Sequence, residues 1–216
     1  MDMSRWSRSG TVLILAALLG ACSMIEMPPR VTTVVALVEV QHRIDGAPQA
    51  AGQLQPGTPS EESRFTYSDA WIEAEFTVHS EFIELKLHNR SSDDLAIAWE
   101  RSQFVGRQNI GVPLVSAGEL TFISGRRSPD PKVVPAGSTV MMRLAQYVGD
   151  TSRFGVTRPL FNVDRGDKAR AESSARGLLG TDIRIILALT QGNAPHEYSF
   201  RFRLDEVRLD GEAVSP

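Results

Sequence analysis

The chain has 216 residues, of which 42% are hydrophobic and 23% are charged, and its formal net charge at pH 7 is −3. This length and apolar content suffice for one folded domain with a hydrophobic core. The weakly negative charge argues against a general nucleic-acid binder, which normally carries an excess of Lys and Arg. The single cysteine excludes an intramolecular disulfide.

The first 21 residues have the order of a secretory signal peptide. Arg5 and Arg8 precede an uninterrupted apolar run over 11–19 (TVLILAALL), and two small residues follow at 20–21. The apolar run is shorter than the roughly 20 residues that a helix needs to cross a bilayer. The sequence therefore predicts a signal peptide over 1–21 rather than a permanent membrane span.

The only cysteine of the chain follows directly. Leu19-Gly20-Ala21-Cys22 resembles the lipobox of bacterial lipoproteins. The resemblance covers the N-terminal tenth of the chain. It implies a diacylglyceryl group on Cys22, cleavage between Ala21 and Cys22 by the lipoprotein signal peptidase, and acylation of the new amine. Because two or more acyl chains anchor a protein stably, the acylated Cys22 would hold the protein on a lipid membrane. The alternative is an ordinary signal peptide with a chance cysteine near its cut site.

The same resemblance implies a location. Ser23 follows Cys22, at the position where an aspartate looks like an inner-membrane retention signal in enteric-type bacteria. We therefore expect a periplasm-facing protein on the outer membrane rather than the inner one. Residues 1–21 carry two arginines and one aspartate, a net charge of +1, so the cleaved chain has a net charge of −4.

Residues 22–63 are predicted to connect the anchor to the folded body. Two prolines at 28–29 stiffen a short tether. The segment 31–40 (VTTVVALVEV) is apolar and β-branched, which favours a strand, with a helix as the alternative. Residues 45–63 are rich in Pro, Gly, Gln, Ser and Ala, a composition that predicts a flexible linker or a long loop.

The body, residues 64–216, has apolar side chains at every second position of several segments. In Trp71 to Val78 (WIEAEFTV) the apolar residues alternate with polar ones, and the same period is present in 82–89, 95–100, 140–144, 183–189 and 198–204. This period predicts antiparallel strands with one buried face. After residue 204 the alternation slips by one position, which predicts a bulge or a strand end near Asp205.

Turn signals and one helical segment complete the prediction of the fold. Polar or Gly- and Pro-containing stretches at 89–94, 135–138 and 191–195 separate strands, the last as a five-residue hairpin loop. Residues 167–179 (DKARAESSARGLL), followed by Gly180, predict one short helix. We therefore expect a mainly β fold, a two-sheet antiparallel β-sandwich with one short helix.

A second resemblance concerns architecture alone. The run 85–99 (LKLHNRSSDDLAIAW) is similar to the strand–turn–strand at the centre of immunoglobulin-like bacterial domains. This resemblance implies an immunoglobulin-like sandwich. The chain lacks the paired cysteines of the antibody-type members, so nothing beyond the architecture is carried over.

The sequence predicts no catalytic residue, no cofactor and no metal site. The chain has four histidines, at His42, His79, His88 and His196. None of them follows another at a metal-ligand spacing, and we expect surface or structural roles for all four, although strands could bring distant residues together. No nucleophile elbow and no phosphate-binding loop occur in the sequence.

Two groups of residues are candidates for a partner surface. Trp71 and Phe82 fall opposite the apolar faces of their strands, and together they would form an exposed aromatic patch unless another element covers them. The long connection 101–132 carries the second group, which is either a binding loop or a solvated one. Its arginines are Arg101, Arg107, Arg126 and Arg127.

The sequence thus favours a membrane-anchored periplasmic lipoprotein that acts as a non-catalytic binding or assembly module. Its partner would be an envelope protein or a cell-wall component, and not a nucleic acid. The alternative is a ligand carrier or an enzyme whose site is scattered over strands and loops. A pocket with convergent polar groups favours the alternative, and an exposed apolar patch favours the first reading.

Overall fold

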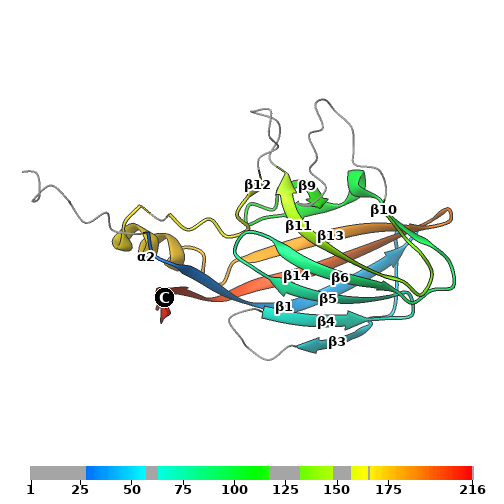
Figure 1. The fold of residues 1–216 in the computed structure, drawn as a ribbon, viewed down its shortest axis with the longest axis horizontal. Coiled ribbons are helices and arrows are strands. Elements are labelled where there is room, and N and C mark those ends of the chain that lie inside the picture. The colour runs from blue at the N-terminus through cyan, green and yellow to red at the C-terminus, as the bar shows by residue number, and fades with distance from the viewer. Residues whose placement is uncertain (1–27, 57–62, 117–131, 148–156, 165, 216) are drawn as a thin grey trace, which may run out of the picture.

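The computed structural model describes residues 28–56, 63–116, 132–147, 157–164 and 166–215. The fold is mainly β, and every strand pairing in these ranges is antiparallel. The strands form two layers that face each other (Figure 1). No helix in the described ranges has the length and apolarity needed to cross a membrane.

The first layer is built on the two longest strands of the chain, β1 and β14. Its members are β1 (Val31–Ile44), β2 (Ala47–Pro48), β7 (Leu95–Ile97), β8 (Gln103–Val105), β10 (Lys132–Val134), β13 (Asp182–Gln191), β14 (Ala194–Leu209) and β15 (Glu212–Ala213). The second layer is built on a meander of consecutive strands. Its members are β3 (Gln53–Pro56), β4 (Ser63–Ser68), β5 (Ile72–Val78), β6 (Ile83–Asn89), β11 (Thr139–Tyr147) and β12 (Thr157–Arg158).

The strand β9 (Gly111–Ser116) connects the two layers. Its first half, residues 111–113, pairs with β8, and its second half, residues 114–116, pairs with β11. The hydrogen-bonded path β2-β1-β14-β13-β8-β9-β11-β6-β5-β4-β3 is therefore one continuous curled sheet. The predicted antiparallel, mainly β fold is confirmed, whereas two separate sheets are not, because β9 belongs to both layers.

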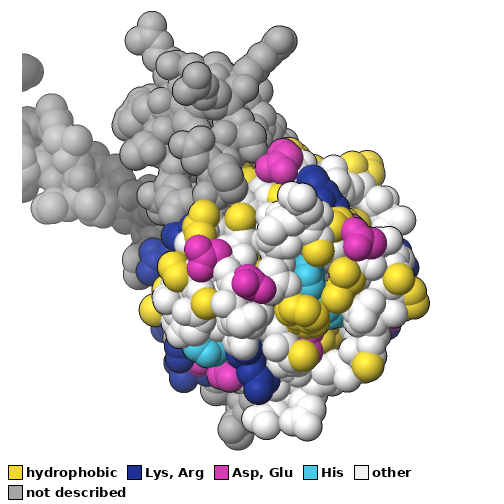
Figure 2. Space-filling model, turned by 90° about the vertical axis from the view of Figure 1, so that its right-hand side faces the viewer, with side chains coloured by type: hydrophobic (Ala, Val, Ile, Leu, Met, Phe, Trp, Pro, Cys, Tyr) yellow, Lys and Arg dark blue, Asp and Glu magenta, His cyan; other side chains and the backbone are white. Residues whose placement is uncertain are grey.

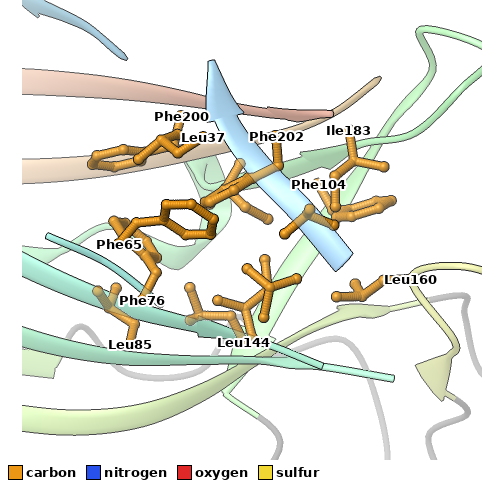
Figure 3. Close-up of a cluster of buried hydrophobic side chains, with 14 of the residues drawn as sticks. Leu37, Phe65, Phe76, Leu85, Phe104, Leu144, Leu160, Ile183, Phe200 and Phe202 are labelled. Carbon is orange, nitrogen blue, oxygen red and sulfur yellow. The ribbon is translucent and has the colours of Figure 1, made fainter. Parts of the chain in front are cut away.

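The core lies between the layers and is filled by the alternating apolar side chains that the sequence predicted. Phe76 of β5 lies 4.6 Å from Phe200 of β14, measured between ring centroids, and Phe65 of β4 lies 5.8 Å from Phe202 (Figure 3). All four rings are buried. Burial of such aromatic side chains is the main source of stability for the fold.

The segment 31–40 is a strand and not a helix, and it belongs to this core. β1 pairs with β14 from Val31 to Ile44, and its side chains Val35 and Leu37 are buried. The pairing register shifts twice, leaving Asp205 of β14 and Val38 of β1 without a partner. The predicted bulge near Asp205 is thus confirmed, and a second bulge lies in β1.

The segment 45–63, predicted as a linker or loop, contains ordered structure in its described part. β2 pairs with the end of β1, and β3 pairs with β4 at the edge of the second layer. Residues 57–62 lie outside the described residues. The backbone hydrogen bonds of these two short strands therefore fasten most of the segment to the body.

Two local predictions differ from the structure in detail, and the predicted turn between two strands at 89–94 is confirmed. The hairpin between β13 and β14 has a two-residue turn at 192–193 instead of a five-residue loop, because Gln191 already pairs with Ala194. The strand predicted over 95–100 ends at residue 97, and a 3-10 helix (Trp99–Arg101) follows. The polar turn 89–94 joins two strands of different layers, since β6 pairs with β5 and β11 while β7 pairs with β10 and β13.

The predicted helix is present as α2 (Lys168–Arg176), which lies at one end of the molecule (Figure 1). Asp167 begins it, because its side chain accepts a hydrogen bond of 2.8 Å from the Arg170 backbone N–H. The helix ends at residue 176, three residues earlier than predicted. Its buried residues, Ala171 and Ala175, join the edge of the core.

On the side opposite β9 the two layers meet without pairing. The Val35 backbone N–H of β1 donates to Ser63 Oγ of β4 at 2.9 Å. β1 and β4 run in the same direction at this contact (Figure 1). Each residue advances both strands by about 3.3 Å. Seven residues after Val35 on β1, and six residues after Ser63 at the end of β4, the two chains are therefore again close together. The residues at these two positions are His42 and Asp69.

Candidate functional site

The end of the molecule opposite α2 holds a cluster of buried and half-buried polar and aromatic side chains, here called the Asp69 cluster. It consists of His42, Tyr67, Asp69, Trp71, His196 and Tyr198. β14 contributes two members because His196 and Tyr198 continue the inward alternation of Phe200. β1 contributes His42, which pairs across the strands with Tyr198. The other members come from β4 and from the turn that connects it to β5.

Asp69 is the centre of the cluster, and both of its carboxylate oxygens are occupied. Its Oδ1 accepts hydrogen bonds of 2.8 Å from the backbone N–H groups of Trp71 and Ile72, which closes the turn between β4 and β5. Its Oδ2 accepts from the hydroxyls of Tyr198 at 3.0 Å and Tyr67 at 3.1 Å. The side chain is only 8% exposed.

These contacts set the ionisation of the carboxyl and of the two phenols. Burial alone opposes ionisation of Asp69, but hydrogen bonds from His42, from two backbone N–H groups and from Tyr198 outweigh it and lower its pKa to about 2. Burial and the nearby carboxylate raise the pKa of both Tyr67 and Tyr198. Asp69 is therefore an anion at neutral pH, and the two tyrosines are neutral donors to it.

The two histidines extend the cluster from Asp69 in a chain. His42 Nδ1 lies 3.2 Å from Asp69 Oδ2, and His42 Nε2 lies 3.2 Å from His196 Nδ1. The His42 ring stacks on Tyr198 with 4.0 Å between ring centroids. Burial, and after it the neighbouring His42, lower the pKa of His196. Because either nitrogen of an imidazole can carry the proton, this chain can hold one proton at two alternative positions.

A hollow opens beside the cluster, with a cavity volume of about 520 Å³. Its lining consists of His42, residues 49–53, residues 68–71 and Arg90. Figure 2 views this end of the molecule and shows histidine surfaces among hydrophobic side chains, with acidic and basic side chains around them. The hollow is open to solvent, and several of its lining groups are polar.

The walls of the hollow are attached to the cluster. Gly52 donates its backbone N–H to the Tyr67 hydroxyl, and a Cβ at position 52 would lie 2.7 Å from the Tyr67 ring, so only glycine fits this close approach. On the other side, Arg90 Nη1 donates to the backbone oxygen of Asp69 at 2.8 Å. The rim is therefore largely preformed.

Trp71 and Phe82, predicted as one aromatic patch, lie at opposite ends of β5. Trp71 is half-buried at the hollow, with its ring centroid 4.9 Å from that of His196. Phe82 is half-buried at the far end, 4.5 Å from the ring of His79 and 5.1 Å from the guanidinium of Arg143. Seven residues of β5, about 23 Å, separate the two rings, so no shared patch forms.

The structure places the arginine candidates away from the hollow where it describes them. Arg101 is exposed at the end of the 3-10 helix. Arg107 Nη1 donates to the Gly177 backbone oxygen at 3.0 Å, next to α2. Arg126 and Arg127 lie outside the described residues, and so does Cys22.

Comparisons with protein-family models, with curated proteins and with solved structures gave no match. The capabilities of the site therefore follow from its geometry. Among the residues that the structure describes, no group of three or more His, Cys, Asp or Glu side chains could hold a metal ion. The Asp69 cluster instead fixes donors, acceptors and one aromatic ring at the rim of a hollow.

Sequence reasoning missed the pairing of His42 with His196. One signal was present, because the alternation of Phe202, Phe200 and Tyr198 extends back to His196. No comparable signal existed in β1. The bulge at Val38 reverses the alternation between Leu37 and His42, so the inward direction of His42 cannot be read from the period.

Proposed function

We propose that the protein is a lipid-anchored, periplasm-facing lipoprotein that binds a component of the cell envelope without catalysing a reaction. The observation that carries the binding role is the hollow beside the Asp69 cluster. Its walls are tied to a buried network, and preorganised sites bind with a smaller entropic cost. A concave site with a few convergent polar groups is the usual form of a small-ligand site. Because such a pocket favours a ligand carrier over docking on a flat apolar face, the envelope component that we propose is a small ligand.

The distribution of exposed apolar side chains favours binding in the hollow over docking on a flat sheet face. Within the described ranges, four large hydrophobic side chains are exposed, and they lie on separate elements. They are Leu54 on β3, Ile110 before β9, Val133 on β10 and Met141 on β11. Single exposed hydrophobic residues are ordinary, whereas contiguous patches mark protein-docking surfaces.

The binding role is tested by crosslinking in intact cells, followed by recovery of a C-terminally tagged protein from membranes. Trp71→Ala removes the aromatic wall of the hollow, and Phe82→Ala is the matched control at the far end of β5. We expect the companion recovered with wild-type protein to be lost with Trp71→Ala and kept with Phe82→Ala. Equal recovery with both variants would contradict a role for the hollow.

The anchor rests on the lipobox-like Leu19-Gly20-Ala21-Cys22, and Ser23 supports delivery to the outer membrane. We expect Cys22→Ser to abolish lipid labelling and to leave the precursor uncleaved, because the thioether and the cleavage both require this cysteine. Metabolic labelling with a fatty acid and the electrophoretic mobility of the product measure both effects. A lipid-labelled product of normal size from Cys22→Ser would overturn the lipoprotein assignment.

We also propose that the fold is an immunoglobulin-like β-sandwich. The two facing layers, with their core of alternating side chains, support an immunoglobulin-like β-sandwich in which β9 crosses from one layer to the other. An experimental structure in which β9 pairs with one layer only would leave two separate sheets, as a β-sandwich requires.

A second candidate function is an enzyme, and the contact between Asp69 Oδ2 and His42 Nδ1 favours it. A carboxylate beside an imidazole fixes the tautomer of the ring, as general bases require. Mass spectrometry of a ligand recovered after incubation distinguishes the candidates. An unchanged ligand supports binding alone, whereas a product that forms with wild-type protein and not with His42→Gln supports catalysis.

A further inference from the structure

The ligand class of the hollow can be argued from three properties of its lining. These are one fixed aromatic ring, one exposed positive charge and two carboxamide side chains beside small residues. We propose that the hollow binds a saccharide bearing a carboxylate, with the sugar ring on Trp71 and the carboxylate on Arg90. This inference rests on the proposed binding function and names the ligand of that site.

Trp71 has the fixed position that a stacking platform needs. Its backbone N–H is held by Asp69 Oδ1 at 2.8 Å, and its ring meets the His196 ring at an interplanar angle of 67°. The edge-to-face contact orients the indole from the core side. The electron-rich face of an indole packs well against the C–H groups on one face of a pyranose ring.

Arg90 supplies the charge that selects an acidic ligand. It is exposed, and among the lining residues that the structure describes it alone has an exposed cationic side chain. Asp69 is the one anion in the described part of the lining, and hydrogen bonds already occupy both of its oxygens. A guanidinium has five N–H donors in a planar fork, and this fork matches a carboxylate. Arg90 Nη1 already donates one N–H to the Asp69 backbone oxygen, and the remaining donors are left for a ligand.

The remaining lining suits hydroxyl groups. Gln49 and Gln53 each present a carboxamide, which can donate to one hydroxyl and accept from another. Other parts of the lining have only small side chains, so a sugar ring can approach the indole without meeting bulky groups. These residues are Ala50, Ala51 and Ala70. An apolar ligand would leave the carboxamides and the guanidinium unpaired, which disfavours its binding.

The experiment uses the purified lipidated protein in detergent and the fluorescence of its tryptophans. After cleavage of the signal peptide the chain has two tryptophans, and Trp99 is only 2% exposed, so a change in emission on binding reports Trp71. The probes are N-acetylmuramic acid and N-acetylglucosamine, which differ by the carboxylate-bearing lactyl ether. Arg90→Gln removes the proposed partner of the carboxylate. Arg43→Gln is the control, because Arg43 is exposed on β1 and does not line the hollow.

We expect saturable binding of N-acetylmuramic acid at least about tenfold tighter than that of N-acetylglucosamine, as a charge-assisted contact provides. Arg90→Gln should abolish this preference, and Arg43→Gln should keep it. Equal affinity for both sugars, or a preference that survives in Arg90→Gln, overturns the inference while leaving a binding role for the hollow. If neither sugar binds but Trp71→Ala still loses its crosslinked companion, the ligand class alone is wrong. If neither sugar binds and no companion depends on Trp71, the binding function fails as well.

Discussion

The two ends of β5 carry similar aromatic residues in very different surroundings. At one end Trp71 follows a turn whose carboxylate, Asp69, collects hydrogen bonds from both layers. At the other end Phe82 lies between His79 and Arg143, and the buried His79 Nε2 has no hydrogen-bond partner among the described residues. The difference arises from the opposite layer, because β1 and β14 bring His42, His196 and Tyr198 to one end only. A strand-end aromatic thus becomes part of a site when the facing strands supply polar partners.

The largest expected effect is the loss of stability when the hydrogen-bond network at the Trp71 end of β5 is broken. Asp69→Ala removes the acceptor of two backbone N–H groups and two hydroxyls, and it leaves the buried His42 Nδ1 without its partner. We expect a loss of about 3–5 kcal/mol in the free energy of unfolding, measured by urea denaturation. A loss below about 1 kcal/mol would show that the network contributes no more than a surface ion pair.

As the pH is lowered, the free energy of unfolding should fall in two steps, the first from His196 and the second from Asp69. The lowered pKa of His196 means that the unfolded state binds a proton first, so stability falls as the pH drops below about 6.5. The pKa of Asp69 is lowered from 3.8 to about 2, so its contribution is present above pH 4 and is lost as the pH falls toward 2. We expect this second step to amount to about 2 kcal/mol. Urea denaturation between pH 7.5 and 2 measures both steps.

Two variants assign these steps. Asp69→Asn should remove the step between pH 4 and 2, and His196→Gln should remove the step below pH 6.5. A wild-type stability that stays constant from pH 7.5 to 4 would contradict the burial of a neutral His196.

A smaller effect is expected from a single member of the cluster. Tyr198→Phe removes one hydroxyl that donates to Asp69 Oδ2 and keeps the stacked ring beneath His42. We expect a destabilisation of about 1 kcal/mol, and an Asp69 pKa closer to its ordinary value. An NMR titration of the Asp69 carboxyl carbon measures the pKa. An unchanged pKa in Tyr198→Phe would mean that this hydroxyl does not stabilise the anion.

The smallest effect should come from the Phe82 end. Glu84 pairs with Arg143 at 3.1 Å, and both side chains are partly exposed. We expect Glu84→Ala to change the free energy of unfolding by less than about 1 kcal/mol, since solvent and salt screen such pairs. A cost comparable with that of Asp69→Ala would remove the contrast between the two ends of β5.

The sequence predicted the elements more fully than their arrangement. The alternation around Phe76 and Phe200 is a local property of each strand, and the structure confirms it. That β9 joins both layers depends on pairing across the chain, which no local pattern encodes. The two-residue hairpin at 192–193 was within reach of sequence reasoning, because Gly-Asn between two strands is a signal for a tight turn.

The site was harder to predict for a specific physical reason. In the sequence Asp69 is an ordinary turn residue. Its contacts with His42 and Tyr198 arise only because β1 and β14 lie opposite β4. His42 is hidden by the bulge at Val38, which moves its side chain to the opposite face. Trp71 was selected from the sequence, and of the predicted surface residues that the structure describes it alone lines the hollow.

The central claim is that the hollow is the surface through which this protein meets the cell envelope. A photo-crosslinking amino acid placed at Gln53, at the rim of the hollow, tests it most directly in intact cells. The matched position is Met141, which is 71% exposed on β11 and outside the hollow. We expect one crosslinked envelope component from position 53 and none from position 141. The same adduct from both positions, or an adduct from position 141 alone, would contradict the claim.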